Sequence, residues 1–235
     1  YVPCDQYETK ALLDYVLKEK GPCYIRMGRG KVDDVYNENT KFDFSKINIL
    51  RKGKDIVLFA TGMMVQEALK AAEEVDATVV NVCSIKPIDK EGILSMLSSH
   101  KKAYALEEHN IIGGLFSAIS EVKAQSDITT PLYPIGVNDV FGQSGKASDV
   151  LDKYGLTSKH IVEKIKYMMT DQFEHPNGKY KVDDLLKMQD YYNSVCNVFF
   201  GSVEDWLTFK LVNYTGYIHR LRSFYTTQLT NILSF

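Results

Sequence analysis

The stretch D-I-V-L-F-A-T-G-M-M-V-Q-E-A-L-K-A-A-E-E-V, residues 55–75, decides the fold of this chain. Its first part is a continuous apolar run, which is typical of a strand buried on both faces of a parallel sheet. Gly62 turns the chain, and Met63–Val75 then repeats its apolar residues at the three- and four-residue steps of a helix. A buried strand followed at once by a helix is the repeating unit of α/β folds.

The same alternation continues along the chain on the C-terminal side of this stretch. Further short apolar strands are predicted at Ala77–Cys83, Ala103–Leu106 and Leu132–Ile135. Helices are predicted to begin after the N-cap Asp89 and to cover Gly113–Val122, Ala147–Tyr154 and Ser158–Ile165. We therefore expect an α/β fold with a three-layer, mostly parallel sheet that helices cover on both faces.

The N-terminal part is predicted to hold one helix and one strand. Tyr7–Lys18 has helical apolar spacing, Asp5 precedes it as an N-cap, and Glu8 stands three residues later as in a capping box. Cys23–Met27 is predicted to form a short strand. Residues 37–45 are polar and aperiodic, so we interpret them as a linker.

The character of the sequence changes after about residue 167. Strand–helix alternation stops, aromatic residues become frequent, and the spacing of residues 182–199 predicts helix again. We expect this aromatic-rich helical tail to pack on the α/β domain or on a continuation that this sequence lacks. The opening Tyr1–Asp5 and the apolar end at Phe235 are typical of a fragment or an open-ended reading frame.

Composition argues against several classes of protein. With 235 residues, a net charge of -2 and a pI near 6.2, the chain lacks the basic character of nucleic-acid-binding proteins. No apolar run reaches the length that spans a membrane, and no signal peptide opens the chain. The four cysteines are far apart and the five histidines are scattered. This distribution argues against a zinc site and for reduced thiols in a cytoplasmic protein.

A polar cluster stands where a predicted strand ends, in L-E-E-H-N-I-I-G-G, residues 106–114. Such strand ends form the rim at which open α/β sheets bind ligands and partners. Glu107, Glu108 and His109 could hold a proton relay, because a neighbouring carboxylate raises the pKa of an imidazole. The favoured interpretation is structural: salt bridges, a cap for the next helix, and close helix–strand packing at Gly113-Gly114.

Two further strand exits carry side chains of interest. The connection G-V-N-D-V-F-G-Q-S-G, residues 136–145, is long and glycine-rich, and ordered loops of that kind tend to be functional. Asp139, Phe141 and Lys146 decorate it, and we interpret it as an interface element first and a ligand loop second. Lys86 follows an earlier strand and could meet an anion, although a solvated lysine is the favoured interpretation.

Six motifs occur in a fixed order along the chain. They are G-P-C-Y-I-R-M-G-R-G-K (21–31), D-I-V-L-F-A-T-G (55–62), S-I-K-P-I-D-K (84–90), E-E-H-N-I-I-G-G (107–114), I-G-V-N-D-V-F-G-Q-S-G (135–145) and L-D-K-Y-G-L-T (151–157). Together they resemble the transketolases, most closely the C-terminal section of the two-subunit form, from residue 1 to about 167. The 1-deoxyxylulose-5-phosphate synthases and the β-subunits of 2-oxo-acid dehydrogenase decarboxylases share this domain in looser form, and G-R-G-K and E-E-H-N favour transketolase.

The resemblance implies a thiamine diphosphate enzyme of three modules, of which this chain holds only part. It divides the chain into the end of a pyrimidine-binding module (1–36), a linker (37–46), a transketolase C-terminal domain (47–167) and the helical tail (168–235). Thiamine diphosphate and its Mg²⁺ would be bound mainly by modules that this sequence lacks. The implied partners are an N-terminal transketolase subunit or upstream domains, further copies in a homo-oligomer of the assembled enzyme, and sugar phosphates.

The resemblance also implies one substrate-binding residue. Arg29 aligns with an arginine that contacts the phosphate of the sugar substrate in transketolases, and a guanidinium between glycines can grip a phosphate with its planar fork. Arg26 points to the other strand face by alternation and is predicted to be structural. The spacing of G-R-G-K does not meet the Walker pattern, which we discard. Glu108 and His109 remain further catalytic candidates.

Two classes of function remain open. As part of an enzyme, the chain would help to transfer a two-carbon ketol unit between sugar phosphates, and it would be inactive without the cofactor-binding modules. A fragment similar to 1-deoxyxylulose-5-phosphate synthase is the alternative within this class. As a non-catalytic assembly module, the chain would instead recruit a different protein through its tail, which the resemblance does not cover.

Overall fold

The computed structural model describes residues 1–28 and 30–169, so Arg29 and the predicted tail from residue 170 onward lie outside the described part. The described residues belong to one compact unit, Tyr1–Asp171. The helices are α1 (Gln6–Val16), α2 (Met64–Val75), α3 (Lys90–Ser99), α4 (Leu115–Ala124), α5 (Ala147–Lys153) and α6 (Ser158–Met169). The strands are β1 (Asn48–Arg51), β2 (Ile56–Ala60), β3 (Thr78–Asn81), β4 (Lys102–Asn110) and β5 (Leu132–Val137).

The strands form one five-stranded sheet in the order β1-β3-β2-β4-β5. Strands β2, β3, β4 and β5 run parallel to their neighbours, while β1 pairs antiparallel with β3 at one edge. In the centre of the sheet, Leu58 of β2 stands between Val79 of β3 and Tyr104 of β4. The expected mostly parallel sheet is confirmed.

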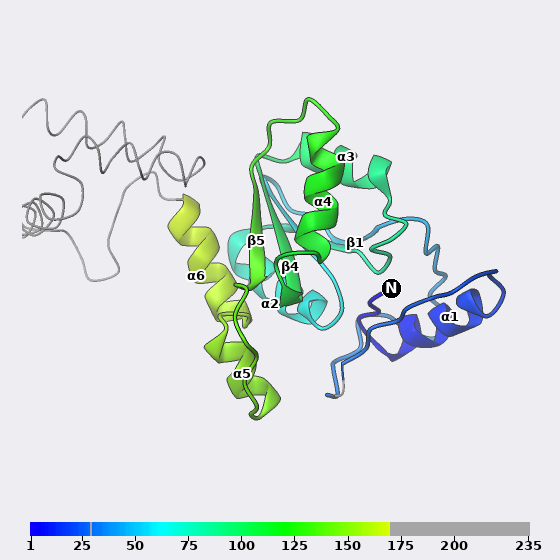
Figure 1. Ribbon diagram of the computed structural model, residues 1–235. Coiled ribbons are helices and arrows are strands. Elements are labelled where there is room, and N and C mark those ends of the chain that lie inside the picture. The colour runs from blue at the N-terminus through cyan, green and yellow to red at the C-terminus, as the bar shows by residue number, and fades with distance from the viewer. Residues whose placement is uncertain (29, 170–235) are drawn as a thin grey trace, which may run out of the picture. The chain divides into compact units, whose positions relative to one another are not determined.

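Helices cover both faces of the sheet, and all five residues of the central strand β2 are therefore buried. On one face Leu58 packs in a core cluster with Met64 of α2 and Ile161 of α6. On the other face Val57 and Phe59 pack in a second cluster with residues of α3 and α4. Figure 1 shows α3 and α4 side by side against the sheet, with α6 beyond β5. The chain is therefore a three-layer α/β fold, as expected.

Local signals in the sequence account for the ends of several helices. Asp89 caps α3 by accepting a hydrogen bond from the Gly92 N–H. Gly62 has a φ of +56° at the sharp turn between β2 and α2, a conformation that favours glycine. Asp5 caps α1 through the Glu8 N–H, and its second carboxylate oxygen accepts from the N–H of Tyr36. The Asp5 side chain therefore joins α1 to a segment thirty residues later.

The structure differs from expectation at three places. Strand β4 runs to Asn110 instead of ending at Leu106, because β5 continues to pair with it past a register shift. The edge strand β1 was not anticipated. The predicted strand at residues 23–27 is wrong, since these residues are extended without strand pairing. Their backbone contact is with Tyr1, whose carbonyl accepts from the Arg26 N–H at 2.9 Å.

The expected linker contributes to a small core of its own. Phe42 and Phe44 stack at 5.7 Å between ring centroids, and Phe44 also meets Tyr15 of α1 at 5.3 Å. Phe44 packs in a cluster with the buried Leu12 and Cys83. The stretch that follows α1 is thus bound to the α/β layers by aromatic packing.

Candidate functional site

The carboxyl edge of the sheet contains the point where the strand order reverses. From β2 the chain passes through α2 to β3 on one side, and from β4 it passes through α4 to β5 on the other side. The loops that leave β2 and β4 therefore diverge, and open α/β sheets bind ligands in the crevice at such a point. Thr61 follows β2 there, and its N–H donates to the carbonyl of Leu106 in β4 at 3.2 Å.

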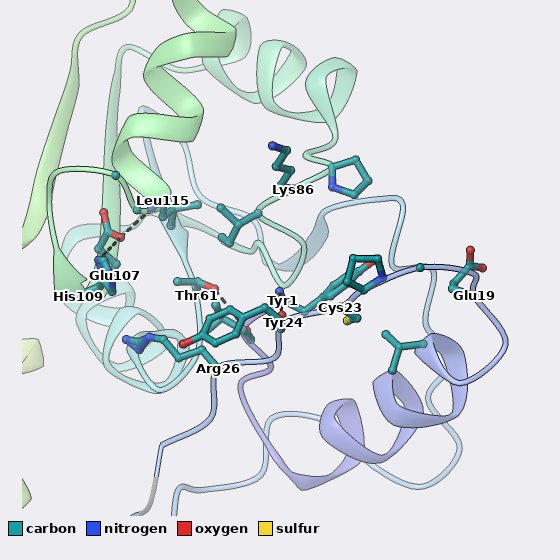
Figure 2. A pocket seen from close by; sticks show the side chains of 18 of the residues that line it. Tyr1, Glu19, Cys23, Tyr24, Arg26, Thr61, Lys86, Glu107, His109 and Leu115 are labelled. Carbon is teal, nitrogen blue, oxygen red and sulfur yellow. Dashed lines mark hydrogen bonds and ion pairs between the residues drawn. The ribbon is translucent and has the colours of Figure 1, made fainter.

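The N-terminal segment lies across this edge. The Val2 N–H donates to the Cys83 carbonyl at 2.8 Å, and the Val2 carbonyl accepts from the Gly62 N–H at 3.3 Å. Between this segment and the loops after β3 and β4 is a pocket of about 510 Å³. Figure 2 shows Arg26, Lys86 and His109 around it, each from a different segment of the chain. The sequence motifs of residues 21–31, 84–90 and 107–114 thus meet at one pocket.

Glu107 caps helix α4 from the neighbouring strand. Its side chain is 2% exposed, and its two carboxylate oxygens accept from the N–H of Leu115 at 2.7 Å (Figure 2) and from the N–H of Phe116 at 2.9 Å. These N–H groups lack partners within the helix, and the positive end of the helix dipole favours a carboxylate there. Both carboxylate oxygens of Glu107 therefore accept hydrogen bonds that cap α4, which is a structural role.

The glycines after β4 allow this capping contact. Gly113 has a φ of +83°, a backbone conformation that side chains disfavour. A Cβ atom on Gly114 would lie 1.9 Å from Glu107 Oε2, so only glycine lets the carboxylate reach the helix. The predicted close helix–strand packing is confirmed at Gly114, whereas a Cβ atom on Gly113 would meet nothing within 4 Å.

Glu108 points away from the Glu107 cap, whereas His109 lies beside it. His109 Nδ1 lies 3.9 Å from Glu107 Oε2, beyond hydrogen-bond range, and 2.8 Å from the Asn110 carbonyl. Glu108 Oε2 forms an ion pair with Arg26 Nη2 at 3.2 Å, and Arg26 also donates to the Glu108 carbonyl. The ion pair joins the N-terminal segment to β4, which agrees with a structural Arg26. A catalytic role for Glu108 or His109 stays a prediction.

A second groove at the same edge lies beside the predicted phosphate-binding turn. It has a volume of about 1080 Å³, and Gly28 and Gly30 are among its lining residues, on either side of Arg29. Arg29 itself lies outside the described residues. Its contact with a substrate phosphate stays a prediction.

A buried polar cluster joins α1 to the sheet, and it was not expected from the sequence. The carboxylate of Glu8, 1% exposed, accepts from the Cys4 N–H at 2.8 Å and from Asn81 Nδ2 at 2.7 Å. The same Asn81 amide donates to the hydroxyl of Tyr36 at 3.0 Å. The sequence signal was Asn81 itself, a polar residue inside an otherwise apolar strand, which must find a partner when buried.

Burial governs the titration of this cluster. It raises the pKa of the Glu8 carboxyl, although hydrogen bonds from Cys4 and Asn81 oppose the shift. Burial, together with the nearby Glu8, also raises the pKa of the thiols of Cys4 and Cys83. Thiols with a raised pKa remain protonated at neutral pH and are weak nucleophiles. We therefore assign this cluster a structural role.

The described residues show no clustered carboxylate ligands for the metal ion that holds the diphosphate end of thiamine diphosphate. That group needs a divalent metal ion, which takes oxygen ligands from carboxylates and carbonyls. Residues 1–28 and 30–169 bring together no three His, Cys, Asp or Glu side chains that could hold a metal ion. Nor does this part of the chain contain a helix long and apolar enough to cross a membrane.

The comparisons with known proteins agree with this architecture. A sequence profile of the transketolase C-terminal domain matches residues 45–161. A transketolase C-terminal section from Methanocaldococcus jannaschii is 40% identical over 170 residues, covering 69% of this chain and 53% of the relative. A 1-deoxy-D-xylulose-5-phosphate synthase from Dechloromonas aromatica is 34% identical over 167 residues, covering 70% of this chain and 27% of that enzyme.

A solved structure shares the fold as well. A split-gene transketolase, described as an inactive β4 tetramer, superposes with a TM-score of 0.65 and 34% identity, covering 71% of this chain and 55% of that one. This chain thus spans about half the length of the first two-subunit relatives that it matches. Residues 45–161 form a transketolase C-terminal domain, and through it the chain belongs to the transketolase family.

Proposed function

We propose that this chain is the C-terminal part of a thiamine diphosphate-dependent enzyme that transfers a two-carbon ketol unit between sugar phosphates. The observation that carries the proposal is the meeting of three family motifs at the carboxyl edge of a transketolase C-terminal domain. The cofactor and its metal ion would be held mainly by other modules of the assembled enzyme, and no three His, Cys, Asp or Glu side chains of the described residues come together as metal ligands. Alone, the chain neither binds it tightly nor turns over substrate.

The chain's own share of the function is positioning. Arg29, between Gly28 and Gly30, binds the phosphate of the sugar substrate. Glu108 holds the N-terminal segment through its ion pair with Arg26, and His109 stands on the rim of the pocket beside it. Holding reacting groups in a fixed geometry accelerates their reaction, so rigid attachment of this segment matters for catalysis.

The partner that supplies the cofactor is an N-terminal transketolase subunit or domain. The relative from Methanocaldococcus jannaschii is a C-terminal section, and the similar solved structure is a split-gene transketolase, so C-terminal parts that contain this domain occur as separate chains. We further propose that this chain associates with copies of itself, as the described β4 tetramer does. The free thiols of Cys4, Cys23 and Cys83 are in keeping with a cytoplasmic enzyme.

A second candidate within the same chemistry is a 1-deoxy-D-xylulose-5-phosphate synthase. It is favoured by the 34% identity to the enzyme from Dechloromonas aromatica over 167 residues. Both candidates need the same missing modules, so the present residues do not decide between them. The product that the assembled enzyme forms distinguishes the two candidates.

Reconstitution tests the proposed function. The full chain is mixed with transketolase modules that bind both the diphosphate and the pyrimidine of the cofactor, with thiamine diphosphate and with Mg²⁺, and the transfer of a ketol unit from a ketose phosphate to an aldose phosphate is measured. We expect transfer from the mixture and none from either chain alone. Transfer by the isolated chain would overturn the proposal, and formation of 1-deoxy-D-xylulose 5-phosphate instead would favour the second candidate.

A further inference from the structure

A buried amide of α2 holds two segments of the wall of the groove beside Gly28 and Gly30. Gln66, in the first turn of α2, is 7% exposed. Its Nε2 atom donates to the carbonyls of Cys4 and Asp33, each at 2.8 Å. Cys4 and Asp33 line the groove of about 1080 Å³, whereas Gln66 does not. The side chain of Gln66 therefore supports the groove without facing its interior.

A second buried side chain holds the residues that follow Asp33. The carboxylate of Asp5 is 3% exposed, and one of its oxygens accepts from the N–H groups of Val35 at 2.9 Å and Tyr36 at 2.7 Å. Hydrogen bonds are stronger where the local dielectric constant is low. Together with the bond from Gln66, these bonds fix this part of the chain against α1 and α2.

The chain is also held on the N-terminal side of the predicted phosphate-binding turn, residues 28–30, but at the surface. There Arg26 forms its ion pair with Glu108 at 3.2 Å, and the two side chains are 25% and 44% exposed. Ion pairs that water reaches contribute little stability. The buried hydrogen bond from Gln66 to Asp33 is therefore the firmer attachment of the two.

We propose that Gln66 is a positioning residue for the phosphate of the sugar substrate, acting through the carbonyl of Asp33. The inference rests on the proposed function, in which Arg29 binds that phosphate. A guanidinium recognises a phosphate through a planar fork, so its direction matters. Holding the chain beside the turn lowers the entropy cost of binding. Gln66 itself does not touch the substrate, and its effect is on the affinity for a substrate that carries a phosphate.

The test compares two acceptors that differ only in the phosphate. The full chain is reconstituted with the cofactor-binding modules as above, and ketol transfer to ribose 5-phosphate and to ribose is measured. Gln66→Met keeps the length of the side chain but cannot donate a hydrogen bond. The matched control is Gln125→Met, at an exposed amide whose Nε2 atom donates to the carbonyl of Glu121 at 3.0 Å.

We expect Gln66→Met to raise the KM for ribose 5-phosphate about tenfold, because a displacement of about 1 Å in a binding group is enough for such a loss. Its kcat and its KM for ribose should change less than about twofold, as should every constant of Gln125→Met. A merely structural role for Gln66 would instead reduce transfer to both acceptors alike.

Hydrogen exchange of the full chain alone is a second measurement, which does not depend on activity. Peptides that cover residues 27–36 should exchange faster in Gln66→Met than in the wild type or in Gln125→Met, while peptides of the sheet stay unchanged. Gln66→Asn keeps an amide but is one methylene shorter, and we expect the same effects from it. It replaces Gln66→Met if circular dichroism shows that variant to be unfolded.

Three outcomes would overturn the inference. They are an unchanged KM for ribose 5-phosphate, an equal rise of KM for both acceptors, and unchanged exchange at residues 27–36. A wild-type mixture that transfers no ketol unit refutes the proposed function and this role with it. A wild type that does transfer, beside a Gln66→Met variant with an unchanged KM, refutes the role of Gln66 and leaves the proposed function standing.

Discussion

At the scale of single residues, the carboxylate of Glu107 shows how a polar motif can serve a fold. Two backbone N–H groups at the start of α4 donate to it, and its side chain is buried. The next two side chains of the strand go elsewhere, Glu108 to Arg26 and His109 to the pocket rim. Neighbouring polar residues of this motif thus perform separate tasks, and Glu107 and Glu108 differ because successive strand residues point to opposite faces.

This division of roles predicts opposite effects on stability. Glu107→Ala leaves the N–H groups of Leu115 and Phe116 without partners and should lower the free energy of unfolding by about 2–3 kcal/mol. His109→Ala, at a side chain that is 45% exposed, should change it by less than about 0.5 kcal/mol. Urea unfolding of the two variants measures this difference. Equal destabilisation by both would contradict the capping role.

The buried carboxyl of Glu8 makes stability depend on pH. Burial raises its pKa in the folded chain above the unfolded value of about 4.3. The folded chain therefore binds this proton more tightly, so the contribution of Glu8 to stability is complete below the unfolded pKa and is lost as pH rises through the folded pKa.

Glu8→Gln should therefore gain stability relative to the wild type as pH rises. A glutamine can keep the hydrogen bond from the Cys4 N–H and can donate to the Asn81 Oδ1 atom, which is buried without a partner. Denaturant unfolding between about pH 4 and pH 7 measures the difference, with Glu19→Gln at an exposed carboxyl as the baseline for losing one charge. If the unfolding free energy of Glu8→Gln fell relative to that of the wild type as pH rises, the raised pKa of Glu8 would be contradicted.

At the scale of elements, the junction of β4 and α4 depends on a close approach. A Cβ atom at residue 114 would lie 1.9 Å from Glu107 Oε2, whereas a Cβ atom on Gly28 would meet nothing within 4 Å. Gly114→Ala should displace the carboxylate and cost about 2 kcal/mol of stability, and Gly28→Ala should cost less than about 0.5 kcal/mol. Thermal unfolding compares the two, and a Gly114→Ala protein as stable as Gly28→Ala would exclude a requirement for glycine at residue 114.

Elements defined by local pattern were predictable from the sequence, and elements defined by distant partners were not. The apolar run of β2, the spacing of α2 and the cap at Asp89 are local, and all three are confirmed. The end of β4 depends on how far β5 continues beside it, and β1 depends on the exposed edge of β3. Residues 23–27 have strand composition but no strand beside them in the described part of the chain.

At the scale of the whole molecule, the N-terminal segment closes the carboxyl edge of the sheet. The sequence motifs indicated the family and the rim, and the structure brings three of those motifs to one pocket. The polar cluster of Glu8, Asn81 and Tyr36 could not be predicted, because its members come from three segments that meet only in the folded chain. The predicted domain boundaries stay predictions.

The central claim is that this chain completes a thiamine diphosphate site that other modules hold. Calorimetric titration of thiamine diphosphate with Mg²⁺ tests it most directly, using the full chain alone, an N-terminal subunit that also carries the pyrimidine-binding module alone, and their mixture. We expect no saturable binding to this chain alone and tighter binding to the mixture than to the N-terminal subunit. Saturable binding of the cofactor to the isolated chain would contradict it.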